Sequence, residues 1–437
     1  MQTTISPELK NEPDVQISEK MLRTCVHCGF CNATCPTYLL TGNELEGPRG
    51  RIYLIKGMLE GKISNSGSTV EHIDNCLSCL ACETTCPSGV VYSHLLEDAR
   101  PRLEQWRSRP WSDLLLRAVL VRLLPYPNRF RWALRLSNIG RAMNFLLPSR
   151  FRHLPKMAPK VLPRPSQLSM AGEKPAQGTR RMRVALLTGC AQQVMGPQIN
   201  DATLRLFARR GIEVVIPETM GCCGALTYHM GERPQSLEMM RQNIDAWYNE
   251  IQGKGLDAIV LNTSGCGTVV REYGHIFRNE PKWAEKAATV ANLVRDVSEV
   301  VCNIGLGEIK ERPALRVAYH DACSLQHGQK IVDPPRALLQ TAGFEVMEVP
   351  ESHICCGSAG TYNLLKPDIA LQLQERKSNN IRQINPDVVA AGNIGCIEQI
   401  GRVVDIPVVH TIELLDWATG GPTPVSLAGK NKVMQRS

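Results

Sequence analysis

Eight cysteines in the N-terminal part of the chain fall into two runs with the same spacing. In each run three cysteines stand at every third position, a fourth follows four residues later, and a proline comes directly after it. The runs are Cys25, Cys28, Cys31, Cys35 with Pro36, and Cys76, Cys79, Cys82, Cys86 with Pro87. This spacing is typical of proteins that carry two [4Fe–4S] clusters. The sequence therefore predicts one-electron redox chemistry.

The fourth cysteine of each run is expected to bind the other cluster, as it does in two-cluster proteins. Two crossing ligand sets follow: Cys25, Cys28, Cys31 and Cys86 for the first cluster, and Cys76, Cys79, Cys82 and Cys35 for the second. Zinc also binds Cys-x2-Cys pairs, but a zinc ion takes four ligands and does not explain two complete runs. A disulfide framework is not expected either, since no secretory signal precedes the runs.

A long insert separates the two cysteine runs. Within it, Ile52, Ile55, Met58 and Leu59 recur at helical spacing. A helical insert at this place resembles the all-helical ferredoxin domain of succinate dehydrogenase and fumarate reductase iron–sulfur subunits. The resemblance implies an all-helical two-cluster domain, which we place at residues 15–110.

The positive charge of the chain is concentrated in one segment. The 437-residue sequence has a net charge of +8, and residues 100–152 are rich in Arg, lack Lys and contain two acids, Glu104 and Asp113. Apolar stretches at 113–124 and 130–136 are predicted to be helical, and both are too short to span a bilayer. We expect residues 111–182 to form an Arg-rich connector that ends in a proline-rich linker.

Two interpretations of this connector stay open. Its helices either pack between two domains with their Arg side chains outward, or contact an anionic membrane surface or a partner subunit. Nucleic-acid binding is not expected, because no nucleic-acid motif accompanies the charge.

Beyond residue 182 the chain repeats itself. Each copy has a short apolar run that ends near a cysteine, a second run before a Cys-Cys-Gly motif, and a third run before Gly-Cys. Cys190 and Cys222 are the same number of positions apart in the first copy as Cys323 and Cys355 are in the second. The pattern predicts two βαβαβ units, at 183–312 and 313–420, each with a parallel sheet. The fold class is thus multidomain, α followed by a duplicated α/β domain.

The repeat cysteines all follow predicted strands. Carboxyl ends of parallel strands share one edge of a sheet, so the cysteines of each copy are expected to converge. The two sets are Cys190, Cys222, Cys223 and Cys266, and Cys323, Cys355, Cys356 and Cys396. Helices after Cys190 and Cys323 are expected to favour the thiolate form. Each set could hold a cluster or zinc, form a redox dithiol, or be an inert remnant of the duplication.

The Cys-Cys-Gly motif at this spacing resembles the cysteine-rich domain of heterodisulfide reductase. In that enzyme each copy ends in Cys-x2-Cys, and here the last of these cysteines is absent from both copies. Its absence argues against clusters with five cysteine ligands, as found in that enzyme. His320, Asp321 and His353 lie near the second set of cysteines. Such residues are hydrogen-bonding neighbours more often than catalytic groups, and we expect the same of these three. Cys302 belongs to neither copy and is expected to be a buried small apolar residue.

The chain lacks a flavin or dinucleotide motif, because no Gly-x-Gly-x-x-Gly follows a predicted strand. In its order of parts the chain resembles the iron–sulfur subunits of glycolate oxidase (glycolate dehydrogenase). The resemblance implies partner subunits that carry FAD and oxidise glycolate to glyoxylate. It also implies electron transfer to a quinone or another acceptor, at the inner face of the cytoplasmic membrane. No catalytic residue is assigned to this chain.

Three alternatives remain for the function. The chain could serve lactate oxidation, or be a sibling subunit of anaerobic glycerol-3-phosphate dehydrogenase. It could also be a thiol–disulfide reductase that uses the Cys-Cys-Gly sites directly.

Overall fold

An all-helical domain begins the chain, as the sequence predicts. The computed structural model describes residues 1–63, 67–106, 109–142, 151–159, 161–311 and 313–428. The first helices are α1 (Pro13–Thr24), α2 (Pro36–Thr41), α3 (Pro48–Leu59), α4 (Gly67–Asp74), α5 (Ala81–Thr85) and α6 (Tyr92–Trp106). Proline is the first residue of α1, α2 and α3. An N–H at this position has no acceptor within a helix, so proline's lack of one costs no hydrogen bond. Leu22, Ile55, Ile73 and Leu95 are fully buried between these helices.

Three connector helices link this domain to the rest of the chain. They are α7 (Trp111–Leu123), α8 (Pro127–Ala142) and α9 (Leu154–Met157). Leu116, Leu120 and Val121 of α7 are buried against Met230 and Leu365, one from each cysteine-rich copy. Among the residues that the structure describes, no helix is long and apolar enough to cross a membrane.

Two sheets with the same parallel arrangement confirm the predicted duplication. The first contains β1 (Gly172–Lys174), β2 (Met182–Leu187), β3 (Ile212–Ile216), β4 (Ala258–Leu261) and β5 (Val294–Asp296), in the order β1-β3-β2-β4-β5. The second contains β6 (Arg316–His320), β7 (Glu345–Glu348), β8 (Val388–Ala391) and β9 (Val408–His410), in the order β7-β6-β8-β9. All pairs are parallel except β1 with β3.

Helices cover the sheets and connect their strands. In the first copy they are α10 (Gln192–Met195), α11 (Pro197–Arg209), α12 (Ala225–His229), α13 (Arg233–Gln252), α14 (Ser264–Arg271), α15 (Tyr273–Ile276), α16 (Ala284–Leu293) and α17 (Val297–Ile304). In the second they are a π-helical segment (Ser324–Gly328), α18 (Asp333–Thr341), α19 (Tyr362–Leu365), α20 (Pro367–Gln383), α21 (Ile394–Gly401), α22 (Thr411–Ala418) and α23 (Val425–Ala428).

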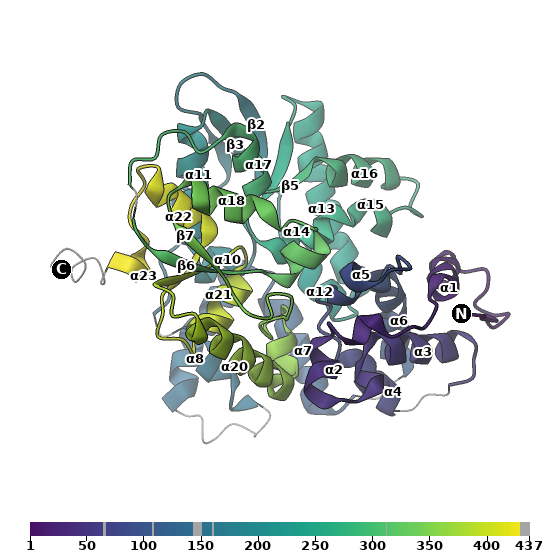
Figure 1. Ribbon diagram of the computed structural model, residues 1–437. Coiled ribbons are helices and arrows are strands. Elements are labelled where there is room, and N and C mark those ends of the chain that lie inside the picture. Colours follow the sequence, from purple (N-terminus) through teal and green to yellow (C-terminus); the bar gives the residue numbers. More distant parts are fainter. Residues whose placement is uncertain (64–66, 107–108, 143–150, 160, 312, 429–437) are drawn as a thin grey trace.

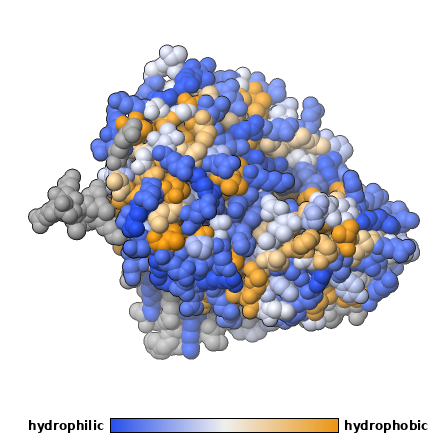
Figure 2. Space-filling view, viewed as in Figure 1, coloured by the Kyte–Doolittle hydropathy of each residue, from blue (hydrophilic) through white to orange (hydrophobic). Residues whose placement is uncertain are grey.

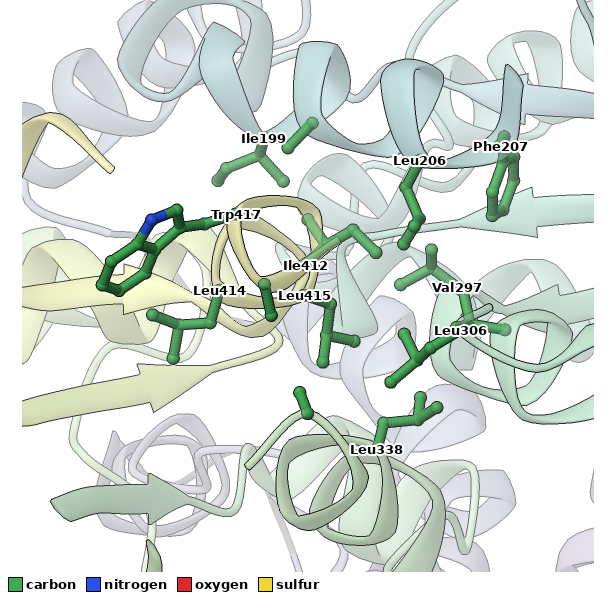
Figure 3. Close-up of a cluster of buried hydrophobic side chains, with 14 of the residues drawn as sticks. Ile199, Leu206, Phe207, Val297, Leu306, Leu338, Ile412, Leu414, Leu415 and Trp417 are labelled. Carbon is green, nitrogen blue, oxygen red and sulfur yellow. The ribbon is translucent and has the colours of Figure 1, made fainter. Parts of the chain in front are cut away.

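The two copies share one hydrophobic core. Figure 3 shows α22 side chains, including Ile412 and Leu415, pointing between Leu206 of α11 and Leu338 of α18. Helix α11 packs on α22, and α17 packs on α18. Since α11 corresponds to α18 and α17 to α22, each copy contributes equivalent helices to the contact. The copies are therefore related by an approximate twofold relation.

The helical domain packs against both copies, at the lower right of the ribbon in Figure 1. The Tyr362 hydroxyl donates to the Asn75 carbonyl at 2.9 Å, and Tyr228 donates to Glu97 at 3.3 Å. Thr84 Oγ1 lies 2.8 Å from His327 Nδ1. On the face shown in Figure 2, hydrophilic residues predominate and apolar residues form separate patches.

Candidate metal centres

The structure brings the first crossing set of cysteines together. Cys25, Cys28, Cys31 and Cys86 line one small hollow. Cys25 directly follows α1, Cys31 lies in a 3-10 turn, and Cys86 directly follows α5, so three local elements position these thiols. Gly29 has a φ of 90°, and a Cβ there would come within 2.4 Å of the Arg49 side chain. The tight loop around Cys28 thus depends on glycine.

The second crossing set lines a neighbouring hollow. Its cysteines are Cys35, Cys76, Cys79 and Cys82. Ser78 and Leu80 adopt left-handed backbone conformations, with φ of 55° and 62°, as the chain winds past Cys79. Cys82 and Tyr92 border both hollows, so the two sites are adjacent. The geometry thus fits two clusters with exchanged fourth ligands.

A buried cation lies beside this second set. Arg51 is 1% exposed, pairs with Glu46 at 2.7 Å, and has its Nη1 3.9 Å from the Cys35 sulfur. Thr37 Oγ1 lies 3.3 Å from the same sulfur. A positive charge and a hydroxyl at this place stabilise negative charge on the sulfurs. Sequence reasoning missed Arg51, because one Arg within a helical pattern gives no sign of its burial.

Three thiols of the helical domain have raised pKa values. Burial, together with the neighbouring thiols, raises the pKa of Cys31 to about 11. Burial also raises the pKa values of Cys79 and Cys82 well above the ordinary thiol value. A metal centre has thiolate ligands, so its assembly at these sites releases protons.

The first cysteine-rich copy brings its four thiols to one end of its sheet. The Cys190 and Cys222 sulfurs are 3.5 Å apart, and Cys223 contacts both Cys222 and Cys266. Contact with Cys222 and burial raise the pKa of Cys190. The expectation of a thiolate here is therefore wrong. The following helix α10 is four residues long, too short to offset burial.

The second copy has the equivalent arrangement with one addition. The Cys323 and Cys355 sulfurs are 3.8 Å apart, and contact with Cys355 plus burial raises the pKa of Cys323, so the thiolate expectation fails here too. A ring nitrogen of His320 and the sulfurs of Cys356 and Cys396 all lie within 4.8 Å of one another. Throughout the described residues, this is the one such group of three candidate ligands.

Cys302 is exposed, and its thiol lies 3.6 Å from the Pro334 carbonyl. The prediction of a buried residue is wrong because Cys302 lies on the solvent side of α17, whose apolar positions face the core. His353 is partly buried, and its carbonyl accepts a hydrogen bond from His327 at 3.2 Å.

Comparisons with known proteins agree with this architecture. Residues 21–90 match the 4Fe-4S dicluster domain, and residues 184–271 and 317–401 match the cysteine-rich domain, CCG. The sequence is 41% identical to the glycolate oxidase iron–sulfur subunit of Escherichia coli, over 96% of this chain and 99% of the relative.

The chain belongs to the family of glycolate oxidase iron–sulfur subunits. It is also 32% identical to the probable glycolate oxidase iron–sulfur subunit of Bacillus subtilis, over 95% of this chain and 98% of the relative. Lactate utilization protein A of Oceanobacillus iheyensis is 27% identical over 54% of this chain and 97% of its own length.

A solved structure of a hypothetical protein from Helicobacter pylori covers 95% of this chain and 74% of its own chain. Its TM-score is 0.55 at 11% identity, which supports the fold alone.

A cavity of about 560 Å³ lies between the helical domain, the connector and the two cysteine-rich copies, and all of these parts line it. Its lining includes Cys76, thiols of both copies, and apolar side chains of α7 and α8 such as Leu120 and Leu134. Glu97 also lines it, and burial raises the pKa of this carboxyl to about 7. Sequence reasoning missed the cavity, because its walls come from segments far apart in the chain.

Proposed function

We propose that this chain is the electron-transfer subunit of a complex that oxidises glycolate to glyoxylate. The observation that carries the proposal is the pair of crossing cysteine sets, together with relatives named as glycolate oxidase iron–sulfur subunits. Cys25, Cys28, Cys31 and Cys86 would hold one [4Fe–4S] cluster, and Cys76, Cys79, Cys82 and Cys35 the other. When bound, such clusters carry single electrons. FAD would belong to partner subunits, where the two-electron oxidation takes place.

The surface around Cys28 supports docking of the FAD-bearing partner there. Cys28 is exposed, and the neighbouring apolar side chains of Val26 and Phe30 are 68% and 64% exposed. Apolar side chains at the mouth of a redox site are typical of a protein interface. In this arrangement the first cysteine set faces the electron donor.

The cavity supports an apolar electron acceptor, and a membrane quinone fits its chemistry. Its lining is mainly apolar, it reaches Cys76 of the second set, and Glu97 can exchange a proton near neutral pH. The connector also exposes Trp111, Trp132 and Leu136, and the Arg135 guanidinium lies 5.0 Å from the Trp132 ring centre. These features support peripheral contact with the inner face of the cytoplasmic membrane.

Lactate oxidation is the second candidate function. It is favoured by the similarity to lactate utilization protein A over 54% of this chain. The mechanism in this chain would be the same, and the substrate would be selected by the flavin subunit.

The experiment that tests the proposal uses the chain co-purified anaerobically with its flavin subunits. We expect about eight iron atoms per chain. Glycolate should reduce the clusters, seen by electron paramagnetic resonance, while lactate reduces them more slowly. The Cys86→Ala variant should lose cluster iron, and Cys302→Ala, at an exposed cysteine outside both sets, should not. Near-zero iron, or clusters that glycolate leaves oxidised, would contradict the proposal.

A further inference from the structure

We propose that the second cysteine-rich copy, and not the first, binds an additional transition-metal centre with His320 as a ligand. The donors are the His320 imidazole and the thiols of Cys356 and Cys396, completed by Cys355 or Cys323. Their chemistry is mixed thiolate and imidazole ligation, which suits zinc or iron. This site goes beyond the electron-transfer role proposed above and does not depend on it.

The spacing of the three donors fits a single metal ion. In a tetrahedral site with metal–sulfur bonds of about 2.3 Å, ligand atoms lie roughly 3.5–4 Å apart. The ligand atoms of His320, Cys356 and Cys396 all lie within 4.8 Å of one another. The described thiols of the helical domain form no such close group, as expected for ligands at separate corners of a cluster.

His320 has the burial of a ligand and lacks other partners. It is 1% exposed, and neither of its ring nitrogens has a hydrogen-bond partner within the described structure. A buried polar group without a partner is costly, and a metal bond removes that cost for one nitrogen. The first copy has Leu187 at the equivalent position, three residues before Cys190.

A buried ammonium group distinguishes the second copy further. Lys377 of α20 is fully buried, and Cys355 and Cys356 lie close to its charge. Its ammonium group donates to the Glu351 carbonyl at 2.6 Å, while the nearby carboxylates of Glu351 and Asp321 pair with Arg376 and Arg336.

A metal site with several thiolates is negatively charged, and it would offset the charge of Lys377. The first copy has Ile244 at the position equivalent to Lys377. Leu187 and Ile244 belong to one apolar cluster with Cys190, Cys222 and Cys223. The first copy therefore has four thiols in an apolar environment and lacks both polar groups.

The test measures iron and zinc per chain in the full-length protein purified anaerobically. We expect about one metal atom beyond the eight irons of two clusters, and the element found identifies the ion. His320→Leu, which copies the first repeat, and Cys396→Ser should each lose it and keep the eight irons. Cys266→Ser, at the position equivalent to Cys396, should keep all the metal.

Two further measurements keep the test decisive if His320→Leu folds poorly. His320→Cys supplies another soft ligand and should retain the metal. X-ray absorption of the wild-type protein at the edge of the extra metal should show sulfur and nitrogen neighbours. The proposal is overturned if no metal exceeds the two clusters, if Cys266→Ser removes it, or if His320→Leu folds and retains it.

Discussion

Arg51 is a buried charge whose partners come from three parts of the helical domain. Its guanidinium donates to Glu46, to Thr37 and to the His72 carbonyl. Glu46 in turn contacts His72 and Asn75. Such a network holds the loop around the second cysteine set, and loss of one ion would leave the other buried without compensation.

Replacement of Arg51 by Met is therefore expected to destabilise the protein by about 3–5 kcal/mol, because the Glu46 carboxylate stays buried. The reduction potential of the cluster at the second set should fall as well, since a nearby positive charge is lost. Calorimetry and a redox titration measure the two effects. Arg49→Met is the control, because the Arg49–Glu44 pair is 33% and 41% exposed and should contribute less than about 1 kcal/mol.

Glu97 makes stability depend on pH. Burial, reinforced by Glu272, raises the pKa of this carboxyl from its ordinary value of 4.5 to about 7. Between these values the folded protein holds a proton that the unfolded chain has released, so stability falls as pH rises from about 4.5 to 7. Glu97→Gln removes this loss and can still accept the Tyr228 hydrogen bond.

The melting temperature of Glu97→Gln relative to wild type should thus be higher at pH 8 than at pH 5. The free-energy difference should change by at most about 3 kcal/mol. Glu238→Gln, at a side chain that is 79% exposed, should show the same difference at both pH values. A flat profile for Glu97→Gln would contradict the assigned pKa.

At the residue scale, the sequence predicts ligands better than their surroundings. The ligand spacing is local, so the crossing thiol sets and the convergence of the repeat thiols follow from the sequence. Arg51, Glu97 and Lys377 acquire their roles from burial against distant segments, which spacing alone does not show. Residue type alone also predicts a buried Cys302, while the structure leaves it exposed.

The connector helices pack between the domains, as one of the two interpretations expects, and they leave part of their apolar surface exposed. Leu116 and Leu120 of α7 are buried, as expected for packing between domains. Their Arg side chains do not all point outward, because Arg131 of α8 is buried and donates to the Gln193 carbonyl at 3.0 Å. Trp132 and Leu136 of α8 remain 61% and 60% exposed, and Arg135 lies 5.0 Å from the Trp132 ring centre.

Membrane contact through α8 predicts weaker vesicle binding when these apolar side chains are removed. Trp132→Ser combined with Leu136→Ser should weaken binding to phosphatidylglycerol vesicles at least tenfold, by roughly the transfer free energy of the two side chains. Co-sedimentation measures the effect. Val425→Ser, at a side chain that is 84% exposed on α23, should leave binding unchanged. Equal binding of all three proteins would exclude this contact.

At the scale of the whole molecule, the duplication creates one core from two sheets. Parallel sheets could be predicted from the strand pattern, but not that α11 and α22 pack across the copies. Ion pairs also stabilise this contact, because Asp416 of α22 pairs with Arg205 and Arg209 of α11, each at 2.6 Å. Near the thiols, Ser264 Oγ of the first copy lies 2.7 Å from Ser324 Oγ of the second. The copies therefore share both their core and the region of their cysteine sites.

A shared core implies that the two copies unfold together. Ile412 of α22 is 1% exposed and lies in the cluster with side chains of both copies, as Figure 3 shows. Ile412→Ala should cost about 2–5 kcal/mol, and calorimetry should show one cysteine-rich transition that shifts to lower temperature as a whole. Leu114→Ala, at a side chain that is 53% exposed on α7, should shift it little. If Ile412→Ala splits the transition and leaves part of it at the wild-type temperature, the copies are independent folding units instead.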